Sequence, residues 1–155
     1  MKFTIEQVAL YPKNPKAAIQ LLSEMGAIDW SFDTVAARGT VFGSESGNTA
    51  ELAFNYDILK GKELEILDYV DGDNWMESQP WRVSHLGMHC TEEELKYWRG
   101  FFLDRDIRVA QEVMTESHTN PVIAGKRWYH YVIFDTFAIL GVDIKFIVRR
   151  DLDNL

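Results

Sequence analysis

The N-terminal segment combines an extended pattern with a helical one. Apolar and polar side chains alternate loosely along residues 3–11, as they do in a half-buried strand. Asn14 can accept a hydrogen bond from a free backbone amide, and Pro15 suits the first position of a helix. A helix is therefore predicted to begin there and to stop at Gly26, which tolerates a left-handed backbone. The spacing i, i+3, i+4 and i+7 predicts its apolar stripe as Ala18, Leu21, Leu22 and Met25.

Strand-like patterns fill the rest of the first half. Two strand-like stretches are predicted between residues 28 and 42, and residues 43–48 (GSESGN) have the composition of a loop. Residues 50–59 and 62–70 flank Lys60-Gly61, which predicts a hairpin.

The second half has the same order of elements. Residues 82–90 predict a strand, and residues 91–94 (TEEE) predict a capping box in which Thr91 and Glu94 bond each other's backbone amides. The helix that follows has an apolar face made by Leu95, Trp98, Phe101 and Phe102. Strands are predicted at 109–115, 127–136 and 137–149, with a loop over 116–126.

The two halves are predicted to be copies of one module, because strand, helix and three strands recur. In this repeat Gln7 is equivalent to His85, and Glu65 is equivalent to Lys145. We expect an α+β fold of two βαβββ modules, whose antiparallel-rich, curled sheets form a shared cleft with the helices outside. The predicted boundaries are residues 1–75 for the first module, 76–81 for a connector, 82–150 for the second module and 151–155 for a tail, all within one structural domain.

Strand alternation turns the four equivalent polar side chains toward this cleft, and the small residues Ala9 and Gly87 leave room beside them. The connector and its neighbours are not typical linker material. They are expected to pack against the body because they include the large or stiff residues Trp75, Met76, Pro80 and Trp81.

Composition excludes several classes of protein. With 46% apolar and 26% charged residues, the chain is typical of a globular protein, and no apolar run approaches the ~20 residues that span a bilayer. The net charge of −8 and the scattered basic residues argue against a nucleic-acid partner. The N-terminus lacks a signal-peptide pattern, and the single cysteine, Cys90, suits a reducing compartment, so we expect a cytoplasmic protein.

Three short motifs resemble the vicinal oxygen chelate superfamily, which includes glyoxalase I, extradiol dioxygenases and the fosfomycin- and bleomycin-resistance proteins. They are residues 7–11 (QVALY), 63–67 (ELEIL) and 84–89 (SHLGMH), and the resemblance extends over almost the whole chain. It implies paired βαβββ modules around a small-molecule site.

In the metal-using members of that superfamily, the first and last strands of each module each supply one ligand. The resemblance therefore implies Gln7, Glu65 and His85 as ligands of one divalent ion, which would be zinc, iron, manganese or nickel. It leaves Lys145 at the fourth place, where a protonated amine has no lone pair to donate.

Lys145 separates the functional hypotheses. In the first, a glyoxalase-type lyase, isomerase or transferase polarises substrate oxygens with the metal, and Lys145 shapes the charge or shuttles a proton as a catalytic residue. In the second, a bleomycin-resistance-like protein sequesters its ligand without metal, and Lys145 forms an ion pair with Glu65. In the third, the protein has kept the fold but acts as an interaction module and has lost the chemistry of the cleft. Whether the protein is an enzyme stays open.

The expected partner is a small molecule. Tyr69, Trp128 and His89 are predicted to contact it, because aromatic side chains near the cleft suit a planar ligand. The resemblance also implies a homodimer, while no membrane or nucleic-acid partner is expected.

Overall fold

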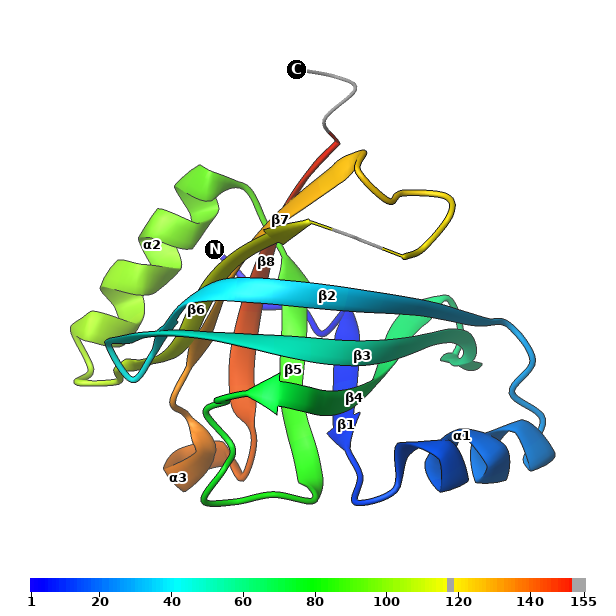
Figure 1. The fold of residues 1–155 in the computed structure, drawn as a ribbon. Helices are drawn as coiled ribbons and strands as arrows, with labels where there is room; N and C mark the ends of the chain where they lie inside the picture. The colour runs from blue at the N-terminus through cyan, green and yellow to red at the C-terminus, as the bar shows by residue number, and fades with distance from the viewer. Residues whose placement is uncertain (117–118, 152–155) are drawn as a thin grey trace.

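A computed structural model describes residues 1–116 and 119–151 and shows a molecule made mostly of strands (Figure 1). The first half runs through β1 (Gln7–Tyr11), α1 (Pro15–Glu24), β2 (Trp30–Val41), β3 (Ser44–Leu59) and β4 (Lys62–Gly72). The second half runs through β5 (Arg82–His89), α2 (Glu92–Leu103), β6 (Val109–Glu116), β7 (Arg127–Phe134), α3 (Phe137–Leu140) and β8 (Asp143–Asp151). Residues 117–118 of the predicted loop and 152–155 of the predicted tail lie outside the described residues.

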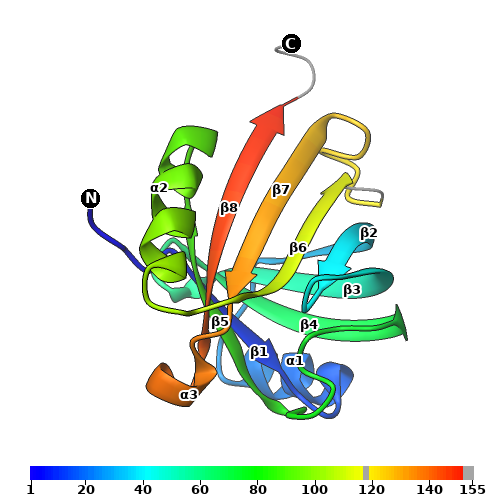
Figure 2. The same ribbon diagram turned by 90° about the vertical axis from the view of Figure 1, so that its left-hand side faces the viewer.

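The strands close into one barrel in the order β1-β4-β3-β2-β6-β7-β8-β5. β1 pairs in parallel with β4 and β5 pairs in parallel with β8, whereas the other neighbours are antiparallel. Figure 2 shows β6, β7 and β8 side by side, with α2 along the outside of β8. The predicted α+β class with a mixed, mainly antiparallel sheet is confirmed at this level.

The strand register is similar in the two halves. The parallel pair β1–β4 sets Ala9 opposite Glu65, and the parallel pair β5–β8 sets Gly87 opposite Lys145. The antiparallel pair β1–β5 joins the halves and sets Ala9 opposite His85. Small residues therefore lie beside the polar ones on these four adjacent strands.

Gly87 has a specific steric role at the junction of the halves. It pairs with Gln7, and a Cβ atom on Gly87 would meet Oε1 of Gln7 at 2.9 Å. Even alanine at this position would press on the Gln7 amide, because real Cβ atoms essentially never approach other heavy atoms so closely. The expected room beside the polar side chains is thus provided by glycine here.

Helix α2 covers the outer face of the second half. It begins with the predicted capping box and buries three residues of its predicted apolar face, Leu95, Trp98 and Phe102. Trp98 stacks on Phe146 of β8 at 5.2 Å between ring centroids, and Phe102 stacks on Phe134 of β7 at 4.3 Å. This aromatic layer holds the back of strand β8, whose other face carries Lys145.

Helix α1 differs from the predicted packing. It starts as expected, with the Ala17 amide donating to Oδ1 of Asn14 at 3.0 Å, but none of its residues is fully buried. Leu21 and Met25 of the predicted stripe are 58% and 72% exposed. The half-buried positions are Pro15, Ala18, Ile19 and Leu22, because α1 lies at one end of the barrel and contacts the sheet mainly at β4 (Figure 1).

Two expectations for the first half were wrong. One continuous strand, β2, replaces the two stretches expected between residues 28 and 42. The predicted loop 43–48 lies almost wholly in β3, since Phe42 and Gly43 both adopt positive φ and reverse the chain in two residues. The hairpin at Lys60-Gly61 is confirmed, and these two residues also have positive φ.

The predicted strands 127–136 and 137–149 are shorter than expected at their junction. β7 ends at Phe134, the short helix α3 follows, and Gly141 ends that helix with a φ of 74° before β8 begins. The backbone amides at the start of α3 donate to the side chain of Asp143.

Candidate functional site

One cavity of about 550 Å³ that opens to the surface collects the polar side chains of four neighbouring strands. Gln7 comes from β1, Glu65 from β4, His85 from β5 and Lys145 from β8, and all four line the cavity. Their exposed fractions are only 2%, 3%, 1% and 8%. The structure therefore brings together the four residues that the repeat marked as equivalent.

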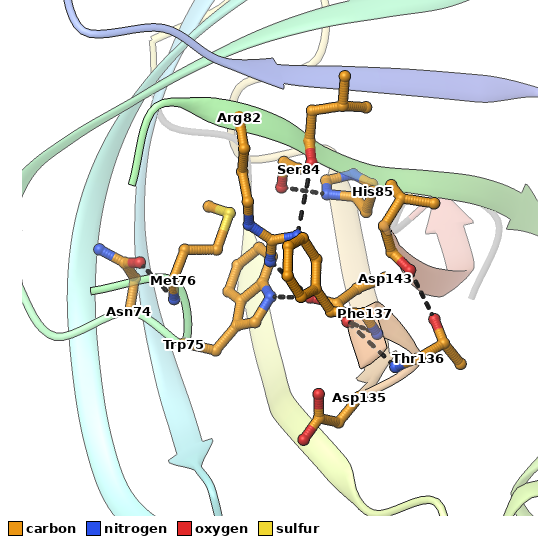
Figure 3. A network of polar contacts seen from close by, with 12 residues as sticks. Asn74, Trp75, Met76, Arg82, Ser84, His85, Asp135, Thr136, Phe137 and Asp143 are labelled. Carbon is orange, nitrogen blue, oxygen red and sulfur yellow. Dashed lines mark hydrogen bonds and ion pairs between the residues drawn. The ribbon is translucent and has the colours of Figure 1, made fainter. Parts of the chain in front are cut away.

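A directed chain of hydrogen bonds orders two of these residues. The Gln7 amide nitrogen donates to the Glu63 carboxylate, which also accepts a 2.6 Å bond from the Tyr56 hydroxyl. The Gln7 oxygen therefore faces His85, whose Nε2 atom lies 2.7 Å away and must carry the proton. The other ring nitrogen, Nδ1, then accepts from the Ser84 hydroxyl at 2.9 Å (Figure 3).

His85 is neutral in this setting. Burial lowers its pKa well below the usual value, and the nearby charges of Lys145 and Arg82 act in the same direction. With one nitrogen donating and the other accepting, the ring meets its hydrogen-bonding needs within the protein.

The pKa of Glu65 is shifted in the opposite direction to that of His85. Burial raises its pKa to about 7, although the positive charge of Lys145 opposes the rise. Its Oε1 atom lies 3.5 Å from Nε2 of His85, yet the hydrogen on that nitrogen points to Gln7. Oε1 of Glu65 has no hydrogen-bond partner within residues 1–116 and 119–151.

Lys145 lies at the cavity wall with its ammonium 4.3 Å from the centre of the Tyr131 ring. This is a cation–π distance, and no oxygen of the described residues accepts a hydrogen bond from the ammonium. Across the part of the chain that the structure describes, no ion pair within 4.0 Å joins Lys145 to a carboxylate. The expected direct pair with Glu65 is therefore replaced by attraction across the cavity.

The three predicted metal ligands converge, but in the observed arrangement they are not free to bind a divalent ion. In the tautomer that the bond to Gln7 requires, Nε2 of His85 carries a proton, so a metal ion could bind there only after that bond opened and the proton moved to Nδ1. Of the three, only Glu65 would bring a negative charge to a metal ion, and the positive ammonium of Lys145 in the same cavity would repel the ion. Among the described residues, no group of three or more His, Cys, Asp or Glu side chains is placed to hold a metal.

Two of the three predicted ligand-contacting residues line the cavity, namely Tyr69 of β4 and His89 of β5. Trp128 is not brought into this group. Its ring lies on the other side of β7, 6.2 Å from the His130 ring and 5.5 Å from the Arg150 guanidinium.

Sequence reasoning did not select Tyr129 and Tyr131, which do line the cavity. The antiparallel register sets Ile133 opposite Lys145, so alternation turns Ile133, Tyr131 and Tyr129 inward and Trp128 outward. A residue directly opposite an inward-facing lysine must also face inward. The sequence alone does not say which residue of β7 lies opposite Lys145, so this rule could not be applied before the register was known.

Trp75, the residue just before the predicted connector, lines the cavity and is held there by a buried carboxylate (Figure 3). Its Nε1 donates to Asp143 at 2.8 Å, and Arg82 donates to the same oxygen at 2.7 Å. The other Asp143 oxygen accepts the amides of Thr136 and Phe137 at the start of α3. Asp143 thus holds Trp75, β5 and α3 together at one end of the barrel. Of the four large or stiff residues expected to pack there, Trp75 and Met76 are buried, whereas Pro80 and Trp81 are exposed.

Asp33 holds a segment at the opposite side of the cavity. Its Oδ1 atom accepts the backbone amides of Thr119 and Asn120 at 2.9 and 3.0 Å. Asn120, Val122 and Ile123 of the same segment line the cavity. A single carboxylate on β2 therefore positions one wall of the cavity.

Comparisons with known proteins identify the fold. No protein-family profile matches the sequence. No curated protein matches it either. Among solved structures, a hypothetical protein from Bacillus halodurans aligns over 96% of this chain and 95% of its own, with a TM-score of 0.55 and 8% identity.

Two methylmalonyl-CoA epimerases are similar to the same extent. The enzyme from Mycobacterium tuberculosis aligns over 96% of this chain and 92% of its own, with a TM-score of 0.53 and 11% identity. A Streptomyces coelicolor variant in complex with 2-nitronate-propionyl-CoA aligns over 96% and 95%, again with a TM-score of 0.53 and 11% identity. At these identities the similarity shows the fold alone. In the described part of the chain, no helix is long and apolar enough to cross a membrane.

Proposed function

We propose that this protein is a vicinal oxygen chelate protein that binds a small molecule directly in its barrel cavity, without a metal ion. The bond between His85 and Gln7 carries this proposal. It closes two of the three expected metal ligands onto each other at 2.7 Å, while an ammonium occupies the fourth place.

The duplicated-module interpretation supports membership of the superfamily. Ala9 opposite Glu65 in one half corresponds to Gly87 opposite Lys145 in the other. The family resemblance assigns metal-ligand places to these polar residues, although one of them is a lysine. We infer that the site has kept its geometry and changed its chemistry.

The cavity suits a ligand-binding role. Its volume of about 550 Å³ lies in the range of small-molecule pockets, which runs from ~300 to ~1,000 Å³. Apolar side chains and aromatic rings make up about half of its lining, and polar or charged side chains make up the rest, with Gln7, Glu65, His85 and Lys145 among them. We propose that Tyr69 and His89 contact the ligand and that Lys145 binds it rather than transferring protons around a metal.

The test uses N-phenyl-1-naphthylamine, a neutral probe that fluoresces in apolar cavities, with untagged protein in the presence of EDTA. We expect saturable binding at one site per chain, and no metal in elemental analysis of protein that was purified without chelator. Leu52→Trp fills the cavity and should abolish probe binding, whereas Val70→Trp, at a position 51% exposed on β4, should not. One equivalent of tightly held metal, or probe binding that Leu52→Trp does not alter, would refute the proposal.

A further inference from the structure

The geometry points to an organic anion, an apolar ring compound bearing a carboxylate, as the class of molecule that the cavity takes, with Lys145 binding the carboxylate. This inference rests on the proposed function and adds the chemical identity of the ligand. It is drawn from a buried cation that the protein itself does not satisfy.

Lys145 is nine-tenths buried, and its head group faces the cavity. Within residues 1–116 and 119–151 its ammonium makes no hydrogen bond or ion pair, and it lies over the face of the Tyr131 ring, 4.3 Å from the centre. An ammonium that faces a cavity and has no protein oxygen as acceptor is stabilised when an oxygen anion enters that cavity. The ligand is therefore expected to bring the missing acceptors.

Glu65 does not fill this role. No ion pair within 4.0 Å connects it to Lys145 in the described residues, and its Oε1 atom lies nearer to His85. That oxygen also has no hydrogen-bond partner in the described part of the chain. Both groups line the same cavity, so a carboxylate that enters it can accept from Lys145.

A second cation lies on the same face of β8. Arg149 is four residues from Lys145, so ~13 Å separates their positions along the strand, and both line the cavity. Arg127, which is bonded to Asp151, also lines it. Lys62 is a fourth cation of the lining, but the carboxylates of Glu6, Asp33, Glu63 and Glu65 line the same cavity, so the charges balance and the preference for an anion rests on Lys145 itself.

The wall beside the polar centre is aromatic. The rings of Tyr69 and Trp75 lie edge to face at 6.2 Å, and the Trp75 ring lies 6.2 Å from that of His85. Tyr131 continues this wall to Lys145. A planar ring system can therefore pack against aromatic faces while its carboxylate reaches the ammonium.

The experiment compares 2-naphthoate with 2-naphthamide, two probes of nearly equal shape that differ in charge, by titration calorimetry. We expect the wild-type protein to prefer the acid by about tenfold to a hundredfold, as one charge-assisted hydrogen bond supplies. Lys145→Met should remove that preference and leave the affinity for the amide unchanged, whereas Lys145→Arg should retain it. Lys96→Met on α2, which makes the same charge change at an exposed position, should have no effect.

Equal affinity of the wild-type protein for acid and amide would overturn the inference, and this comparison needs no variant to fold. Equal weakening of both probes by Lys145→Met would overturn it as well. If neither naphthalene probe binds while N-phenyl-1-naphthylamine does, the anion inference fails and the proposed function stands. If that neutral probe also fails, the proposed function itself is wrong.

Discussion

Replacing Asp143 by alanine should strongly destabilise the protein. The side chain is 1% exposed and accepts four hydrogen bonds, at 2.7 and 2.8 Å from Arg82 and Trp75 and at 3.1 and 3.0 Å from the amides of Thr136 and Phe137. Alanine would leave the Arg82 guanidinium, whose side chain is 11% exposed, without its carboxylate. Removing one partner of a buried ion pair costs about 3–5 kcal/mol, a large part of the roughly 5–15 kcal/mol that stabilises a typical protein.

Urea unfolding followed by circular dichroism measures this cost. With a slope of about 2 kcal/mol per molar urea, the midpoint should fall by about 2 M. Asp135→Ala is the matched control, because Asp135 pairs with Arg108 at the surface and its loss should cost less than about 1 kcal/mol. A loss below about 1 kcal/mol for Asp143→Ala would refute the argument that this carboxylate holds the end of the barrel together.

Three further predictions concern other parts of the molecule. Gly87→Ala should lower the free energy of unfolding by about 1–3 kcal/mol through overpacking. Gly100→Ala in helix α2 should raise it by about 0.5–1 kcal/mol, because nothing lies within 4 Å of the new Cβ atom. Similar melting-temperature shifts in the two variants would contradict this. His130 donates to Glu112 at 2.7 Å, and this bond raises the histidine pKa. Stability relative to His130→Gln should therefore be fully present below about pH 6.5 and disappear as pH rises through the raised pKa; a difference that is constant from pH 5 to 9 would exclude the mechanism. Asp33→Ala should release the segment that it holds at the cavity wall and speed dissociation of N-phenyl-1-naphthylamine in stopped-flow measurements by about tenfold, whereas an unchanged rate would show that the segment does not control exit.

Local signals predicted the elements that depend on local chemistry. The capping box before α2 and the two-residue turn at Lys60-Gly61 lie where the sequence placed them, because each involves neighbouring backbone groups. The turn at Phe42-Gly43 was missed, since phenylalanine rarely adopts positive φ and the polar residues after it suggested a loop. Pairing along the whole of β2 overrode that local preference.

The candidate site was partly predictable for a different reason. Equivalence within the repeat was enough to select the buried side chains Gln7, Glu65, His85 and Lys145. The bond between Trp75 and Asp143 at the end of the barrel was not predictable, because the two residues are 68 positions apart and no local pattern relates them. Which aromatic residues of β7 face the cavity depends on a register that the sequence alone does not specify.

The most direct test of a cavity in which a lysine has replaced metal binding is calorimetric titration of Zn²⁺ and Ni²⁺ into untagged wild-type protein and Lys145→Glu. We predict no binding tighter than about 1 mM for the wild-type protein, and one tightly bound ion per chain once the ammonium becomes a carboxylate ligand. One ion bound to the wild-type protein with micromolar affinity, and lost in Glu65→Ala, would contradict the account.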